Sequence, residues 1–361
     1  MNKIKVLQVV PALTHGGISS VVMNWYRQLD KRQYQFDFIS FNDGPLHPEI
    51  TAMGGRVWLI PTLKQQPFLH LKAVIKLLSA APRYQVVHVH NSFKNVVLLW
   101  LAKCFGVKVR VCHSHTSGLE NSRLRPVIGL LKSLTTAASN VHLACGQAAG
   151  LFLYGGKPFT VINNAICLEK FAVSSGHKQP HQHLPSNKTL LLQVGRFSKV
   201  KNHQFLLQLA KQPSLADDIH FVCVGEGPLK AQFCQQITRL NLQSRFTVLP
   251  ATAAIANLLQ SVDGFIMPSL FEGVSVALLE AQAAALPCLI ADTISTESDM
   301  GLGIVSRHGL DDLASWLTTL NNLPQVQVSQ AQIHAAYAER GYTTDSVLRQ
   351  LIAFYQLEEP S

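Results

Sequence analysis

Short β-branched runs that alternate with helical stretches place the strongest constraint on how this chain can fold. Three such runs in its first half are KIKVLQVV (3–10), YQFDFISF (34–41) and VKVRVCHSH (107–115). Stretches with apolar residues at helical spacing, such as SSVVMNWYRQL (19–29), lie between them. Strands that alternate with helices in this way predict a mostly parallel, doubly wound α/β sheet.

The same rhythm restarts after a polar segment, 173–189, which is rich in Pro, Ser and His and indicates a linker. A chain of 361 residues also exceeds one ordinary core. We therefore predict two Rossmann-like domains, 1–172 and 190–340, and a helix within 341–361 that packs back on the first domain. Ligands of parallel sheets bind beyond the carboxyl ends of the strands, so a cleft between facing domains is the expected site.

Charge and cysteine usage narrow the function classes. Residues 1–180 hold 20 Lys+Arg and 6 Asp+Glu, a net +14, whereas residues 181–361 have a net charge of −4. The basic residues are scattered, which disfavours nucleic acid and favours a phosphate-bearing substrate or an anionic membrane surface. Seven cysteines without C-x-x-C spacing indicate reduced thiols in a cytoplasmic protein. The apolar start is short and interrupted by Pro11, which favours a buried strand over a signal peptide.

Two glycine-rich stretches follow predicted strands. In THGGISS, Gly16 and Gly17 would let backbone N–H groups approach a phosphate at a helix N-terminus, although a simple tight turn explains them equally well. The stretch lacks both the full G-x-G-x-x-G and the GK[ST] patterns. In VGEGPL, Gly225 and Gly227 form a second strand-to-helix turn.

Histidines and cations also lie at predicted strand ends. Alternation places His113 and His115 on one face of a strand. They could act as metal ligands, although no third ligand is obvious nearby, as a hydrogen-bonded pair, or as contacts to a substrate. In VGRFSKVKN, Arg196 and Lys201 lie on a loop between strand and helix, where two cations suit a diphosphate. Solvated surface charge is the alternative for these two.

The stretch FEGVSVALLEAQ holds two carboxylates. Glu272 is expected at the carboxyl end of a strand, and Glu280 more than a turn into the following helix, among apolar neighbours. A carboxylate there needs hydrogen-bond donors, which a ribose diol would supply. Otherwise Glu272 interacts only with the helix dipole and Glu280 faces solvent. The backbone N–H groups expected to face an anion at the helix N-terminus are those of Gly273, Val274 and Ser275.

GRFSKVKN, VGEGPL and PSLFEGVSVALLEAQAAALP occur in an order and spacing that resemble the retaining glycosyltransferases of family 4, which have the GT-B fold and build bacterial capsular and exopolysaccharide units. The resemblance covers nearly the whole chain. It implies transfer of a sugar from a UDP- or GDP-linked donor to a glycan or lipid-linked acceptor, with retained anomeric configuration. No metal and no other cofactor are expected.

Carried over by position, Glu272 would bind hydroxyl groups of the donor sugar and Glu280 the ribose. Arg196 and Lys201 would hold the donor diphosphate. The stretch PATAAIANLLQ departs from the family pattern near the nucleobase, and INNA departs from the usual IPNG turn. Ser275 stands where proline is usual.

In the first domain, Gly16 and Gly17 would let the backbone approach the same diphosphate. His115 aligns best with the family's strand-end histidine near the reacting sugar, and His113 is the alternative. A nucleotide-sugar epimerase and a catalytically inactive nucleotide-sugar-binding subunit remain the alternative functions.

A peripheral position at the inner face of the plasma membrane is a further expectation for the basic first domain. Apolar side chains between cations would insert at the interface. The residues on which this expectation rests are Arg110, Arg123, Arg125 and Lys132, with Trp100, Leu130 and Leu131.

Overall fold

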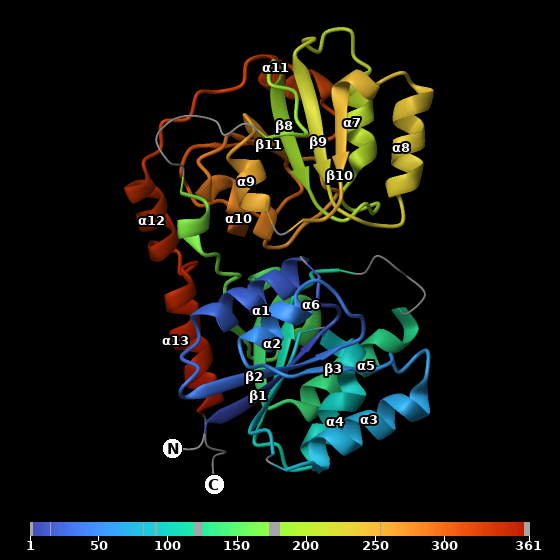
Figure 1. Ribbon diagram of the computed structural model, residues 1–361, viewed down its shortest axis with the longest axis vertical. Helices are drawn as coiled ribbons and strands as arrows, with labels where there is room; N and C mark the ends of the chain where they lie inside the picture. The colour runs from blue at the N-terminus through green and yellow to red at the C-terminus, as the bar shows by residue number, and fades with distance from the viewer. Residues whose placement is uncertain are drawn as a thin grey trace. The chain divides into compact units, whose positions relative to one another are not determined.

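The computed structural model describes residues 3–14, 16–81, 83–90, 92–118, 125–172, 181–252 and 254–356. The chain divides into two compact units (Figure 1). Unit 1 consists of residues 1–165 and 341–361, and unit 2 of residues 166–340. The predicted first boundary was residue 172, and residues 173–180 of the predicted linker lie outside the described residues. The last described helix belongs to unit 1 although it follows unit 2 in sequence.

Unit 1 is built on a parallel sheet whose described strands run in the order β3-β2-β1-β4-β5-β6-β7. The strands are β1 (Ile4–Val10), β2 (Tyr34–Ser40), β3 (Val57–Leu59), β4 (Val86–Val89), β5 (Val109–Ser114), β6 (Val141–Ala144) and β7 (Thr160–Val161). The central strands β4 and β5 are buried over their whole length, as is typical of strands inside a parallel sheet.

Helices cover both faces of this sheet (Figure 1). They are α1 (Gly17–Gln28), α2 (His47–Ala52), α3 (Pro67–Ser79), α4 (Val96–Cys104), α5 (Arg125–Ala138), α6 (Gln147–Tyr154) and α13 (Thr344–Tyr355), with a short 3₁₀ helix at Ser92–Asn95. Leu7 and Val9 face a core shared with Val74 of α3 and Leu98 of α4. On the opposite face, Trp25 of α1 packs over histidines of β4 and β5.

Unit 2 repeats the plan with a parallel sheet in the order β10-β9-β8-β11-β12-β13. Its strands are β8 (Thr189–Val194), β9 (Ile219–Val224), β10 (Phe246–Leu249), β11 (Gly264–Met267), β12 (Cys288–Ala291) and β13 (Val305–His308). Its helices are α7 (His203–Ala210), α8 (Lys230–Arg239), α9 (Ile255–Leu259), α10 (Val276–Ala283), α11 (Leu313–Asn321) and α12 (Gln330–Glu339), with 3₁₀ turns at Leu168–Lys170, Gln243–Arg245 and Thr296–Ser298.

These two sheets confirm the predicted pair of Rossmann-like, doubly wound domains. In each sheet the strand order reverses beside the first strand of the unit, between β1 and β4 and between β8 and β11. Loops on either side of such a reversal diverge at the carboxyl end of the sheet and leave a crevice for a ligand. The loops after β8 and β11 carry Arg196, Lys201 and Glu272, so three predicted site residues lie at the reversal of unit 2.

Candidate active site

The glycines of VGEGPL are required by the fold of unit 2. Gly225 and Gly227 have φ of +156° and +157°, and a Cβ at Gly225 would lie 2.0 Å from the carbonyl oxygen of Gly195. Their absent side chains let the loop after β9 lie against the loop after β8, where the N–H of Phe197 donates to Glu226 O at 3.0 Å. This close contact fixes the backbone on either side of Arg196, and direct contact of these glycines with a ligand stays a prediction.

Lys201 and Glu272 meet across the strand-order reversal. Lys201 Nζ lies 2.6 Å from Glu272 Oε1, and the two side chains are only 19% and 16% exposed. The aliphatic part of Lys201 runs over Gly195, where a Cβ would come within 3.0 Å of Lys201 Cε. The sequence predicted both residues at the site but not that they form an ion pair. The ion pair therefore places a cation and a carboxylate side by side, and their opposite charges compensate each other.

Arg196 differs from Lys201 in being exposed. In the part of the chain that the structure describes, its guanidinium forms no ion pair with an acidic side chain. A planar guanidinium without a carboxylate partner keeps its donors available for a bidentate contact with a phosphate.

The N-terminus of α10 is partly occupied by the protein itself. The N–H of Ser275 donates to Ser298 Oγ at 2.9 Å, and that hydroxyl donates in turn to Gly273 O at 3.2 Å. Ser275 is buried, whereas Gly273 and Val274 are partly exposed. Of the three amides predicted to face an anion, that of Ser275 already has an acceptor within unit 2.

Glu280 lies in the middle of α10 and is partly buried. Burial raises the pKa of its carboxyl to about 7, and nearby Lys170 partly opposes this rise. Among the residues that the structure describes, the carboxyl of Glu280 forms no hydrogen bond and no ion pair. A desolvated carboxyl without an internal partner is costly, so its donors are expected to come from outside the chain.

Gly16 and Gly17, at the start of α1 in unit 1, contrast with the glycines of VGEGPL. Gly16 has φ of −91°, a Cβ on it would come no closer than 3.6 Å to Thr14 Oγ1, and a Cβ on Gly17 would meet nothing within 4 Å. Both residues are exposed. The fold of unit 1 therefore does not require glycine at either position, and close approach of a phosphate to this backbone stays a prediction.

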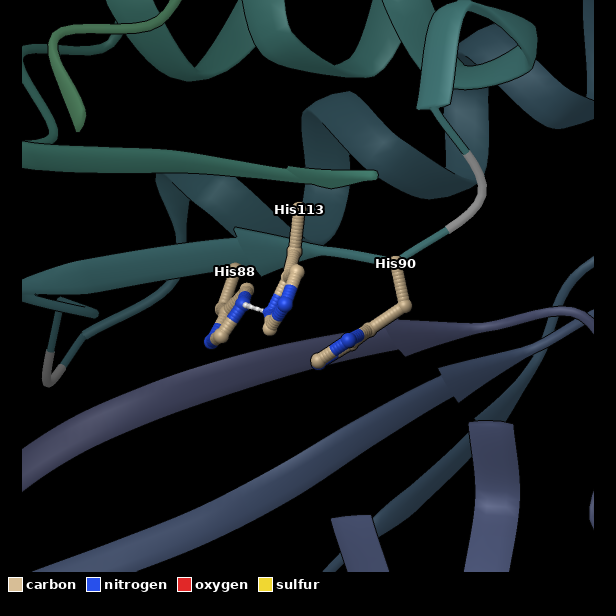
Figure 2. Close-up of side chains that lie close together, drawn as sticks. All are labelled: His88, His90 and His113. Carbon is tan, nitrogen blue, oxygen red and sulfur yellow. Dashed lines mark hydrogen bonds between the residues drawn. The ribbon is translucent and has the colours of Figure 1, made fainter. Parts of the chain in front are cut away.

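His113 and His115 belong to a larger histidine network. His113 Nδ1 lies 3.2 Å from His88 Nε2, and His115 Nε2 lies 3.0 Å from His90 Nδ1. Figure 2 shows His88 and His113 joined by their hydrogen bond, with His90 beside them. His88 and His90 were not predicted as site residues, although VVHVHN has the same alternating histidines as CHSH. Alternation in two neighbouring parallel strands brings all four rings to one face of the sheet.

The network supplies the third histidine that a metal site would need. Nitrogens of His88, His90 and His113 lie within 4.8 Å of one another. However, the rings of His88 and His113 are nearly parallel, at 9°, and those of His88 and His90 stack with centroids 4.0 Å apart. The lone pairs of stacked rings run side by side instead of converging on one ion, as tetrahedral coordination requires. This geometry favours the hydrogen-bonded alternative.

Burial also sets the charge of the network. It lowers the pKa of His88, His90 and His113 well below the usual value, and that of His115 to about 3. All four imidazoles are therefore neutral near pH 7. A neutral imidazole donates from one ring nitrogen and accepts at the other, so each ring has a defined tautomer.

Comparisons with known proteins agree with this arrangement of two domains. Residues 16–154 match the family model described as a glycosyl transferase 4-like domain, and residues 177–300 match the model of glycosyl transferases group 1. The chain is 32% identical to "Putative glycosyltransferase EpsF" of Bacillus subtilis, over 98% of this chain and 96% of that protein.

The chain is also 30% identical to the UDP-Gal:alpha-D-GlcNAc-diphosphoundecaprenol alpha-1,3-galactosyltransferase of Escherichia coli, over 81% of this chain and 80% of that enzyme. Among solved structures, Anabaena HepE in complex with UDP and glucose has a TM-score of 0.77 at 19% identity, over 98% of this chain and 100% of that one. WaaG, a glycosyltransferase involved in lipopolysaccharide biosynthesis, has a TM-score of 0.70 at 16% identity, over 97% of this chain and 99% of that one.

Proposed function

Because this chain belongs to the glycosyltransferases with the GT-B fold, we propose that it transfers a hexosyl or N-acetylhexosaminyl group from a UDP-linked donor to a lipid-linked sugar acceptor. The transfer retains the anomeric configuration and serves the synthesis of a cell-surface polysaccharide. The Escherichia coli relative, whose name states a UDP-Gal donor and a diphosphoundecaprenol acceptor, supports both substrate classes. GDP-linked sugars are the alternative donors.

The observation that carries this proposal is the Lys201–Glu272 ion pair at the strand-order reversal of unit 2. It supplies a cation for a donor phosphate and a carboxylate that accepts hydrogen bonds from hydroxyl groups of the donor sugar. Arg196, on the same loop, adds the second cation. Glu280 binds the ribose diol, whose two hydroxyl groups supply the donors that its carboxyl lacks within the protein.

In the proposed reaction, the bond between the anomeric carbon and the diphosphate oxygen breaks. The acceptor oxygen bonds to the same carbon from the same face, and its proton passes to the departing phosphate oxygen. Arg196 and Lys201 stabilise the negative charge that develops on the leaving diphosphate. These two cations do the work that a divalent metal does in other glycosyl transfer sites, so the proposal includes activity without added metal.

The test combines the purified chain with a panel of UDP- and GDP-sugars and a polyprenyl-diphosphate-linked N-acetylhexosamine, in the presence of EDTA. Release of the nucleotide and growth of the glycan should require both substrates. The proton coupling constant at the new anomeric centre should show the configuration of the donor. An epimer formed without acceptor would favour the epimerase, and binding without turnover would favour an inactive subunit. An inverted product would contradict retention.

A position at the membrane surface is part of the proposal, but the structure changes the residues on which it rests. Arg110 is buried, and its guanidinium donates to the carbonyl oxygens of Ala138 and Val107. Lys132 donates to the carbonyl of Phe152. Arg123 lies outside the described residues, as does the side chain of Arg125. Among the helices that the structure describes, none is long and apolar enough to cross a bilayer.

Helix α3 offers a better membrane-facing surface. Phe68 is 86% exposed, Leu69 and Ile75 are also exposed, and Lys72 and Lys76 lie among them. No acidic residue interrupts α3, so the surface combines insertable apolar side chains with positive charge. Anionic lipid attracts such a surface by roughly 1 kcal/mol per cation. We call these five residues the α3 surface.

Co-sedimentation with vesicles tests the α3 surface. The chain should pellet with anionic vesicles, weakly with neutral ones, and less as salt is raised. Phe68→Ser combined with Ile75→Ser should abolish pelleting. Leu151→Ser, at an exposed leucine of α6, should leave it unchanged. Equal pelleting with neutral and anionic vesicles, or no pelleting with either kind, would exclude the membrane position without affecting the transferase proposal.

A further inference from the structure

A continuous chain of hydrogen bonds runs through the interior of unit 1. It joins side chains within or directly after β1, β4 and β5 to helix α13, namely Gln8, His88, His90, His113, His115 and Tyr355. Gln8 and His88 are paired residues of β1 and β4, and Tyr355 is the last residue of α13. All except His115 are almost fully buried, so water does not compete for these bonds. We call this set the histidine relay.

One branch of the relay leads from Gln8 to His115. Gln8 Oε1 lies 2.8 Å from His90 Nε2, and His90 Nδ1 lies 3.0 Å from His115 Nε2. A carbonyl oxygen only accepts, so His90 Nε2 must carry the proton. His90 is neutral, so its Nδ1 accepts, and His115 Nε2 must donate to it. His115 is neutral too, so its Nδ1 carries a lone pair.

The other branch leads from Gln8 through Tyr355 and His88 to His113. Gln8 Nε2 donates to the hydroxyl oxygen of Tyr355 at 3.1 Å, and that hydroxyl donates to His88 Nδ1 at 2.7 Å. His88 Nε2 then donates to His113 Nδ1. Tyr355, His88 and His90 each donate one bond and accept one, so the bonds of the relay all point the same way, and the relay ends at His113, whose Nε2 is buried without a partner among the described residues.

His115 is the end of the relay that reaches solvent. It follows the last residue of β5, at the carboxyl end of the sheet, and it is partly exposed. Its Nδ1 has no hydrogen-bond partner among the residues described for this chain. This nitrogen lies at the same edge of the unit 1 sheet as the loop of Gly16 and Gly17, because both loops follow parallel strands.

We propose that Gln8, oriented by Tyr355 and acting through His90, holds His115 in the tautomer that carries its proton on Nε2. The lone pair on Nδ1 is then the atom that His115 offers to a substrate. His115 accepts a hydrogen bond from a sugar hydroxyl group and repels a phosphate oxygen. Only the identification of that substrate group depends on the proposed function. Gln8, His90 and Tyr355 are positioning residues in this proposal.

The orientation of the Gln8 amide sets the direction of every hydrogen bond in the relay, so the relay has one alternative polarity. If the Gln8 amide were turned by 180°, every bond would reverse and His115 would present an N–H at Nδ1. The site would then favour a phosphate or carbonyl oxygen instead of a hydroxyl group. The tautomer of His115 therefore distinguishes the two polarities directly.

The experiment measures that tautomer in the ligand-free full-length chain, labelled with ¹⁵N-histidine. Long-range ¹H–¹⁵N correlation separates protonated from unprotonated ring nitrogens, and the His115→Gln spectrum assigns the signals. Between pH 6.5 and 8, wild-type His115 should show a protonated Nε2 and an unprotonated Nδ1. Gln8→Met preserves the size of the side chain but removes both amide contacts, so its His115 should populate both tautomers. Tyr355→Phe should give an intermediate mixture.

Tyr84→Phe is the matched control, since the Tyr84 hydroxyl is buried in unit 1 but bonds to Asp37 outside the relay. It should leave the His115 signals unchanged. Thermal unfolding of each variant confirms folding. When assayed with a nucleotide sugar that the wild-type chain uses as donor, Gln8→Met should lower kcat roughly tenfold with little change in KM. A protonated Nδ1 in the wild type, or a His115 tautomer that Gln8→Met does not alter, would overturn the proposal even if the transferase activity stands.

Discussion

Lys201 and Glu272 neutralise each other across 2.6 Å, whereas Arg196 on the same loop is exposed. Arg196→Ala and Lys201→Ala should each lower turnover by roughly 10²-fold, since each removes a preorganised contact with the leaving diphosphate. Only Lys201→Ala should also lower the thermal stability of unit 2, because it leaves the mostly buried carboxylate of Glu272 without its partner. Lys199→Ala, at an exposed lysine nearby, is the control for both assays. Near-wild-type rates for the two site variants would remove them from the site.

Glu280 links function to stability through its pKa. That pKa is about 7 in the folded chain, above the usual value, so the carboxyl favours the folded state at low pH and opposes it as the pH rises through 7. Glu280→Gln should therefore raise the free energy of unfolding at pH 8 by about 1 to 3 kcal/mol and leave it unchanged at pH 4. The same variant should weaken binding of UDP at least tenfold. Urea titrations at both pH values and calorimetry measure these effects, and a variant without the gain at pH 8 would contradict the buried carboxylate.

At the scale of elements, the glycines at two strand-to-helix turns should respond in opposite ways. Gly225→Ala should destabilise the chain by about 1 to 3 kcal/mol, because its Cβ would meet the Gly195 carbonyl at 2.0 Å. Gly17→Ala adds a methyl group in open space at the start of α1, so stability should stay equal or rise slightly. Its turnover should fall, because the methyl group would occupy the position of the approaching phosphate.

Chemical unfolding and steady-state rates measure the two effects separately. A destabilised Gly17→Ala chain would show that the fold itself requires that glycine. A Gly17→Ala chain with normal turnover would remove the loop from the site.

The sequence predicted those features that repeat along the chain. Strand and helix periods gave both parallel sheets, and the spacing of Glu272 and Glu280 placed one carboxylate in a loop and the other within a helix. Partners distant in sequence could not be predicted. Ser298 reaches the amide of Ser275, and Tyr355 reaches His88, only because the fold brings them together. Arg110 was predicted to be a surface charge because nothing in the local sequence indicates that carbonyl groups surround its guanidinium.

For the whole molecule, the buried histidines predict acid sensitivity. Their pKa values are lowered in the folded chain, so they stay neutral while the unfolded chain binds protons below about pH 6.5. Their contribution to stability is therefore complete above pH 6.5 and is lost as the pH falls. Together, the four histidines should lower the free energy of unfolding at pH 5.5 by up to about 6 kcal/mol relative to pH 8. That is a large share of a typical folding free energy of about 5–15 kcal/mol.

Urea unfolding between pH 8 and 5 measures this slope, and hydrogen exchange locates it. Exchange at pH 5.5 should rise first in the strands of unit 1 that carry the histidine relay. A free energy of unfolding that does not change over this range would show that these rings are protonated in the folded chain.

Unit 1 is interrupted in sequence, since the chain leaves it after Ala165 and returns at Gly341. During translation, about 175 residues of unit 2 are made in between, which takes about 10 to 35 s at ~5–20 residues per second. Throughout that interval the nascent sheet lacks α13, and Gln8 and His88 lack their hydrogen-bond partner, the hydroxyl group of Tyr355. Of the two units, the one that the ribosome starts first is thus the one that completes its folding last, once α13 has been made.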